Sequence, residues 1–176
     1  FDAPKYSQLW QSSLDLQPDG TKHWHRYWNR PSIVVNVLYM RFGNDAVLGN
    51  AIGCLPSMKF SLSGKKQTEL YLQIGSGLAY LNKKYDKLSN PFNNVIGSHW
   101  NNVTQFSFFL ESPGYKNLHI AFGAHFTHFS NARTASPNAG INTGGITLGL
   151  IQKFNVKKEN IKETSEFNDV IDHKAD

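Results

Sequence analysis

The sequence lacks any run of eighteen apolar residues, and it contains a single cysteine, Cys54, among its 176 residues. The missing run excludes a transmembrane helix, which needs about twenty consecutive apolar residues. It does not exclude a transmembrane β-barrel, whose signal is alternation within segments of about ten residues. One cysteine cannot form an internal disulfide and leaves the redox compartment open. The chain begins at Phe1 without a methionine or a signal peptide, which we interpret as a mature product or a fragment.

Charge and aromatic content narrow the class of protein further. The formal net charge is +5 and the pI is about 9.3, a balance that suits nucleic acid but also an anionic membrane surface or a phosphorylated lipid. Aromatic residues make up 13% of the chain and glycine is common, which favours β-structure over a helical bundle. The sequence has no phosphate-binding loop, no CxxC pair and no HExxH zinc motif. Its length suffices for one domain and hardly for two.

The clearest pattern in the chain is the alternation over 117–130. Side chains of a strand point alternately to two faces, so residues two apart share a face. One face of this segment is apolar until its last two residues, whereas the opposite face is mostly small, polar or imidazole. The apolar face carries Leu118, Ile120, Phe122, Ala124, Phe126, His128 and Ser130. The segment therefore predicts a strand with one face in an apolar environment.

Similar alternation recurs in 56–63, 68–80, 102–111 and 143–154, is less clean in 31–42 and is weak in 5–16. Several of these segments exceed the five or six residues that are typical of a globular strand. A tilted membrane-spanning strand needs about nine to eleven residues. A soluble β-sandwich also alternates, so the pattern by itself leaves both classes open.

The lengths of the connections favour the membrane barrel. The long connections are 43–54, 81–101 and 131–142, and the short ones are 64–67 and 112–116. Long loops at one end and short turns at the other are typical of outer-membrane barrels. We therefore predict an all-β fold, an antiparallel up-and-down transmembrane β-barrel of about eight strands, of the outer-membrane type.

Two parts of the chain do not follow this scheme. The connection 17–30 should be short and is long, and we expect it to hold an extra hairpin or an interfacial aromatic belt around Trp24 to Trp28. Seven segments imply an eighth strand, because bacterial single-chain barrels have even strand numbers. We expect that strand around 21–28 or upstream of Phe1. The barrel domain would span 1–154, and 155–176 would form a charged, solvated C-terminal extension.

A histidine and a serine stand at the end of the apolar face of 117–130. His128 and Ser130 are two residues apart, so both side chains leave the strand on the face that would meet lipid. A histidine beside a serine can act as the general base for a serine nucleophile. Polar groups on a lipid-facing surface are costly unless they serve a function. The alternative is a chance pair at the level of the lipid headgroups, where polar groups are harmless.

Two motifs in this region resemble the active-site signature of the lipid A 3-O-deacylases. They are a His-aromatic-Ser-Asn run from His128 to Ala132 and a Pro-Asn-x-Gly-Ile run from Pro137 to Ile141. The resemblance covers roughly residues 30–154 and places the chain in a divergent, longer branch of the family. It implies an outer-membrane esterase that removes an ester-linked 3-hydroxyacyl chain from lipid A and needs no cofactor and no metal.

The resemblance also implies the roles of individual residues. Ser130 would be the nucleophile, and His128 would be its general base. Asn138 matches the asparagine that helps to form the oxyanion hole, and backbone N–H groups near Arg133 would supply a second donor.

The chain departs from the family at the third member of the triad. The family has a glutamate two residues after the motif glycine, where this sequence has Asn142, and no Asp or Glu occurs from Ser112 to Lys158. A Ser-His-Asn arrangement can still fix the histidine tautomer through the amide oxygen. We expect Asn142 to orient His128. Glu111 is the nearest acid before this stretch, but by parity it faces the barrel interior.

Other polar groups carry weaker signals. His119 and His125 share the interior parity and are expected to be hydrogen-bonded there. His23 and His25 fit an aromatic belt better than a metal site. Basic side chains in the expected outer loops could meet the phosphates of lipid A or simply be solvated; they are Lys83, Lys84, Lys87 and Arg133.

The expected partners are lipid A, or lipopolysaccharide, and the outer membrane, with no nucleic acid. A homodimer or a subunit of a membrane complex stays open. Two rival hypotheses remain: a catalytically weak or inactive barrel within an envelope assembly, and a soluble β-sandwich binding module.

Overall fold

The computed structural model describes residues 6–18, 30–63 and 67–154, and within these ranges it has one antiparallel sheet of seven strands. The strands are β1 (Gln8–Leu16), β2 (Ser32–Arg41), β3 (Asn50–Ser61), β4 (Glu69–Leu81), β5 (Trp100–Glu111), β6 (Leu118–Ser130) and β7 (Ile141–Gln152). Each strand pairs with the next one along the chain. No helix in the described ranges has the length and apolar character needed to cross a membrane.

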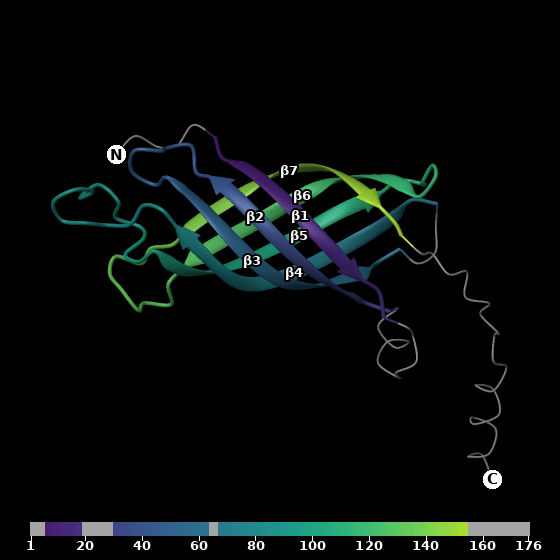
Figure 1. The fold of residues 1–176 in the computed structure, drawn as a ribbon, viewed down its shortest axis with the longest axis horizontal. Helices are drawn as coiled ribbons and strands as arrows, with labels where there is room; N and C mark the ends of the chain where they lie inside the picture. The colour runs from purple at the N-terminus through teal and green to yellow at the C-terminus, as the bar shows by residue number, and fades with distance from the viewer. Residues whose placement is uncertain (1–5, 19–29, 64–66, 155–176) are drawn as a thin grey trace, which may run out of the picture.

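The sheet curls into a barrel-shaped wall whose two edges are β1 and β7 (Figure 1). All six pairings are antiparallel, so β1 and β7 run in the same direction, and no pairing between them occurs among the described residues. The segment 21–28, one of two places where the sequence predicts an eighth strand, lies outside the described residues. So does the predicted extension 155–176.

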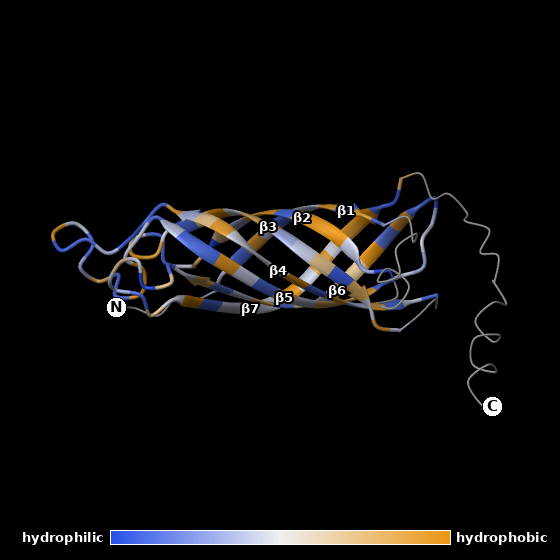
Figure 2. Cartoon of the chain, turned by 90° about the horizontal axis from the view of Figure 1, so that it is seen from below, coloured by the Kyte–Doolittle hydropathy of each residue, from blue (hydrophilic) through white to orange (hydrophobic). Residues whose placement is uncertain are grey.

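Outward-facing side chains of the wall are predominantly apolar, and the predicted parity of the strands is confirmed. In β6 the even-numbered residues from Leu118 to Phe126 face outward, and in β7 Ile146, Leu148 and Leu150 are each at least 75% exposed. Hydrophobic and hydrophilic residues alternate along the strands in Figure 2. An outer surface of this kind needs an apolar environment, because soluble proteins rarely expose such large apolar areas.

The start of β3 differs from the sequence expectation. The connection 43–54 was expected to be a loop, but the strand already begins at Asn50 and the loop is 42–49. The glycine, cysteine and proline of this stretch conceal the alternation. Pro56 has no N–H to donate, and the ladder to β4 accordingly skips Leu55 and Pro56 and resumes at Ser57. A Cβ on Gly77 of β4 would lie 2.0 Å from the Cys54 carbonyl oxygen, so this close approach requires a glycine.

The long connections gather at one end of the barrel, which we call the loop end (Figure 1). They are 42–49, 82–99 and 131–140. The opposite end, which we call the turn end, has the shorter connections 62–68 and 112–117, together with the longer connection 17–31 that the sequence analysis marked as an exception. This alternation of lengths agrees with the sequence prediction.

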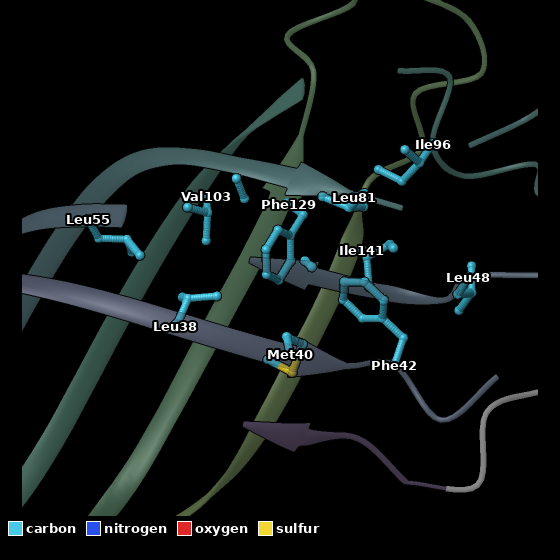
Figure 3. Close-up of a cluster of buried hydrophobic side chains, with 12 residues drawn as sticks. Leu38, Met40, Phe42, Leu48, Leu55, Leu81, Ile96, Val103, Phe129 and Ile141 are labelled. Atoms are coloured by element: carbon cyan, nitrogen blue, oxygen red, sulfur yellow. The ribbon is translucent and has the colours of Figure 1, made fainter. Parts of the chain in front are cut away.

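Apolar side chains fill the interior at the loop end (Figure 3). Phe129 is completely buried there and meets Phe42 edge to face, with ring centroids 5.3 Å apart. Leu81, Ile96 and other buried side chains complete the cluster. The packed cluster fixes the inner face of the end of β6.

A polar network centred on Asn36 occupies the middle of the interior. The Asn36 side-chain oxygen accepts hydrogen bonds from Gln11 (2.9 Å) and Ser13 (2.7 Å). It accepts a third from Gln73 (3.1 Å), while its amide donates to Ser57 (2.6 Å). Asn36 is fully buried, and these bonds satisfy the polar groups that its burial removes from water.

Charged side chains close the interior at the turn end. Glu111 is 3% exposed and pairs with Lys153 at 2.5 Å and with His119 at 3.3 Å. Lys59 lies 2.9 Å from Asp15 and 3.7 Å from Glu111. Glu111 is paired with basic side chains of this interior cluster. Its carboxylate therefore does not contact side chains at the loop end.

Candidate active site

His128 and Ser130 lie on the outer wall of the barrel, at the loop end of β6. Their neighbours in the strand, Thr127 and Phe129, point inward and are fully buried. His128 is opposite Asn142 of β7, as the antiparallel register aligns the two strands. Buried neighbours thus hold the backbone from which both candidate side chains project outward.

The His128 ring is oriented by Asn142. The distance between His128 Nδ1 and Asn142 Oδ1 is 2.6 Å. A side-chain amide oxygen can only accept, so Nδ1 carries the proton in this contact and Nε2 keeps its lone pair. The contact with Asn142 therefore occupies Nδ1, and Nε2 is the nitrogen available to take a proton.

Ser130 is held by the side chain of Asn138. The Asn131 backbone N–H donates to Asn138 Oδ1 at 3.0 Å, which fixes the orientation of the Asn138 amide. Asn138 Nδ2 donates to Ser130 Oγ at 3.2 Å, and the Ser130 hydroxyl lies 3.2 Å from Asn138 Oδ1. The backbone N–H of Ala132 donates to Ser130 Oγ at 3.3 Å. Two N–H donors thus converge on the serine oxygen, an arrangement that can stabilise negative charge.

A tight turn after β6 orients the backbone N–H groups that follow Ser130. Thr134 N–H donates to the Asn131 carbonyl oxygen at 3.1 Å, closing a four-residue turn. The two central residues, Ala132 and Arg133, have φ values of 54° and 65°. Non-glycine residues adopt this left-handed region at a cost of about 1 kcal/mol or more each, and such strain concentrates at functional sites. Within the described chain the Arg133 backbone N–H makes no hydrogen bond.

The loop 82–99 supports the segment that carries Asn138. Ile96 forms an isolated β-bridge with Asn138, and Gly140 N–H donates to the Val95 carbonyl oxygen at 3.1 Å. A Cβ on Gly97 would lie 2.6 Å from the Ser136 carbonyl group, so the two loops approach closely at a glycine. Ile96 is fully buried in the apolar cluster, which anchors the loop to the barrel.

A glycine is required at position 140 for two reasons, the left-handed backbone conformation and the nearness of His128. Its φ is 75°, and an added Cβ would lie 2.9 Å from His128 Cε1 and 2.9 Å from the Phe129 carbonyl oxygen. We expect Gly140→Ala to displace the imidazole and to lower ester hydrolysis at least about tenfold, because small misplacements of catalytic groups are costly. Initial rates of the purified variant in detergent would measure this loss.

Gly144 on the outer face of β7 provides the matched control. An added Cβ there would have only the His125 carbonyl oxygen near it, at 3.7 Å, which is ordinary contact. Gly144→Ala should therefore keep the rate of the parent. Equal rates for Gly140→Ala and the parent would contradict the assigned position of His128.

Several sequence expectations fall elsewhere in the molecule. Glu111 lies in the interior at the turn end and has no part in this site. His119 and His125 face the interior, where they are hydrogen-bonded to Ser112 and Thr147. His23 and His25 lie outside the described residues, and the described residues contain no cluster of metal-binding side chains.

The matches to known proteins agree with this geometry. Residues 10–150 match the family model described as Lipid A 3-O-deacylase (PagL). The chain belongs to the lipid A 3-O-deacylase family. A structure described as "Crystal structure of the outer membrane enzyme PagL" is similar in fold, with a TM-score of 0.61 and 18% identity over 84% of this chain and 95% of that chain. The predicted outer-membrane barrel fold is thereby confirmed. No curated protein sequence matches the chain.

The structure also places three residues beside the site to which the sequence analysis gave no role. In the register of the sheet, Thr104 of β5 is opposite His128, and Asn102 is opposite Ser130. Ser76 of β4 is opposite Thr104. The only signal in the sequence was that polar residues interrupt the apolar faces of these strands. Their nearness to His128 depends on strand register.

Proposed function

We propose that this family member is an outer-membrane esterase that removes an ester-linked 3-hydroxyacyl chain from lipid A by a Ser-His mechanism. The observation that supports the proposal most strongly is the pair His128–Asn142 beside Ser130 on the outer wall. Lipid A presents its acyl chains within the outer leaflet, so an esterase that acts on them needs its nucleophile on a membrane-facing surface. The apolar cluster fills the interior beneath the site, and both side chains project from the outer wall.

In this mechanism Ser130 Oγ attacks the ester carbonyl carbon while His128 Nε2 takes the hydroxyl proton. The tetrahedral intermediate collapses, and the imidazolium gives the proton to the departing sugar oxygen. His128 then activates a water molecule, which releases the fatty acid from Ser130. In the resting structure the Ser130 hydroxyl points to Asn138, so it must turn toward His128 when substrate enters.

In this mechanism three N–H groups would stabilise the oxyanion. Asn138 Nδ2 and the Ala132 backbone N–H already point at Ser130 Oγ, next to which the carbonyl oxygen of the substrate would lie. The Arg133 N–H is in the same strained turn. Removing one such donor from an acyl-transfer enzyme typically lowers kcat by about 100-fold to 1000-fold.

The loop end offers positive charge to the phosphorylated headgroup. Lys83, Lys84 and Lys87 are exposed in the loop 82–99, and Arg133 is exposed in the turn after β6. These side chains would attract the anionic headgroup toward the loop end, while the apolar outer wall accommodates the acyl chains. Orientation in the outer membrane with the loop end outward follows from this proposal.

Mass spectrometry of lipid A incubated with the purified protein in detergent tests the proposal. We expect loss of one hydroxyacyl mass with the parent and none with His128→Gln, because glutamine cannot take up the serine proton. His125→Gln is the matched control, since His125 is on the same strand but faces the interior. It should retain the loss.

The absence of any change with the parent, under conditions in which another lipid A deacylase acts, would contradict the proposal. It would favour a second function, a barrel that has lost hydrolysis and serves in an envelope assembly. Asn142 in place of the family glutamate is the observation that motivates this second function, because an amide stabilises an imidazolium less than a carboxylate does.

A further inference from the structure

A row of polar side chains crosses the outer wall through the candidate site. Asn142, His128, Thr104 and Ser76 occupy successive strands from β7 to β4, each directly opposite the next. Asn102 stands beside this row on β5. Directly opposite side chains on one face have Cβ atoms about 5 Å apart, so the polar row is continuous with the candidate catalytic pair.

The row moves away from the loop end as it leaves the catalytic pair. Asn142 is one residue from the loop end of β7, whereas Ser76 is five residues from the loop end of β4. Leu78 and Tyr80 occupy the outer face of β4 between Ser76 and the loops. Ser76 and Thr104 therefore lie within the apolar surface along which an acyl chain would run, and below the level of the headgroup.

Hydrogen bonds within the row determine what it can bind. The Asn102 amide nitrogen donates to the Gly77 carbonyl oxygen (3.1 Å), which only accepts, and this contact fixes the orientation of the amide. The second Asn102 hydrogen goes to Ser76 Oγ (3.0 Å). Thr104 Oγ1 donates to Asn102 Oδ1 (2.9 Å). Since Thr104 has only one hydroxyl proton, Ser76 must be the donor in the 3.2 Å contact between Ser76 and Thr104.

Every donor hydrogen of these three side chains is therefore already used, either within the cluster or by the Gly77 carbonyl oxygen. Each of the three oxygens keeps unused lone pairs, so the cluster can only accept further hydrogen bonds. A ligand that donates a hydrogen bond to these lone pairs is therefore favoured over one that only accepts.

We propose that Ser76, Asn102 and Thr104 form a subsite that accepts a hydrogen bond from a hydroxyl group on the acyl chain, close to the ester that Ser130 attacks. The subsite thereby selects hydroxylated acyl chains over plain ones. This inference rests on the proposed esterase function. A hydroxyl on the third carbon of the chain is only two carbon–carbon bonds from the ester carbonyl, and Asn102 of the subsite stands directly opposite Ser130.

An amide N–H of a neighbouring acyl chain is the other donor with suitable chemistry. The amide is attached to the sugar and stays at headgroup level, whereas the row runs from the site into the apolar wall. The position of Ser76 and Thr104 therefore favours the hydroxyl of the departing chain.

Three esters of equal chain length distinguish a hydroxyl donor from an amide donor in one assay with detergent-solubilised full-length protein. They carry a 3-hydroxy group, a 3-methoxy group or no substituent, and none contains an amide. We expect kcat/KM of the parent for the hydroxy ester to exceed that for the other two about tenfold, which corresponds to roughly 1.4 kcal/mol. The methoxy ester is the control for polarity, because its oxygen can accept a hydrogen bond but has no hydrogen to donate.

Substitution of Thr104 tests whether this side chain causes the preference for the hydroxy ester. Thr104→Val should bring the ratio of hydroxy to plain ester close to one, and Thr104→Ser should restore it. Ser12→Ala is the matched control, because Ser12 is exposed on the outer face of β1 opposite Val37, away from the site. It should keep the ratio of the parent.

Each outcome bears on a defined claim. Equal rates for the hydroxy and methoxy esters in the parent, or an unchanged ratio in Thr104→Val, would overturn the subsite. Hydrolysis of none of the three esters, together with intact lipid A, would instead indicate failure of the proposed esterase function.

Discussion

Replacing Ser130 by alanine should lower kcat/KM for ester hydrolysis at least about a thousandfold, because removal of a nucleophile eliminates the covalent step. The oxyanion donors on Ala132 and Asn138 would remain, so a small residual rate is expected. Steady-state kinetics with a soluble ester in detergent would measure the change. A fluorophosphonate probe should label the parent and leave Ser130→Ala unlabelled.

A folding control is essential for this comparison. Ser12→Ala, on the outer face of β1, should react with the probe as the parent does. All three proteins should show the same heat-dependent gel migration, which reports a folded barrel. Labelling of folded Ser130→Ala at the rate of the parent would contradict the role of Ser130 as nucleophile.

Replacing Asn142 by aspartate should raise kcat/KM about tenfold or more. The Asn142 oxygen already lies 2.6 Å from His128 Nδ1, so a carboxylate of nearly the same shape reaches the same nitrogen. A carboxylate only accepts hydrogen bonds, whereas an amide can turn and donate, which would put the proton on the wrong nitrogen. The negative charge also stabilises the imidazolium that forms during attack. Stopped-flow or steady-state rates with the same ester would measure the gain.

Asn142→Leu is the companion variant, since it keeps the size of the side chain but removes the contact. It should lower the rate below that of the parent. If aspartate and leucine slow hydrolysis equally, then Asn142 does not orient His128 through its oxygen. Asn142→Glu, which introduces the family residue, tests whether the longer side chain fits opposite His128.

The strands could be predicted because their outer and inner faces differ in chemistry. The alternation over 117–130 gave the outward parity of His128 and Ser130, and the structure has the same parity. The strand β3 was harder, because Gly53 and Pro56 are typical of loops. Only its pairing with β2 and β4, which tolerates a missing N–H at Pro56, makes this segment a strand.

The candidate site was predictable where its residues are close in sequence. His128 and Ser130 share a strand, the loop that follows carries Asn138, and Asn142 lies near the start of the next strand. The inward orientation of the Glu111 side chain also followed from parity, and its ion pairs in the interior agree with this orientation. The polar row could not be predicted in this way, because it depends on the register that places Thr104 of β5 opposite His128 and Ser76 of β4 opposite Thr104.

The sequence by itself determined the class of fold, the membrane-facing side of each clear strand and the identity of the motif residues, because these depend on local periodicity and on short spacings. The tertiary structure decided that Asn142 meets His128, that Asn138 and Ala132 both donate to Ser130, and that Thr104 and Ser76 extend the polar row. The contacts of Ser76 and Thr104 join strands that are distant in sequence, whereas those within 128–142 depend on how the turn and loop between β6 and β7 fold. Their formation depends on hydrogen-bond register between strands and on the packing of the loop 82–99, and neither leaves a periodic signal in the chain.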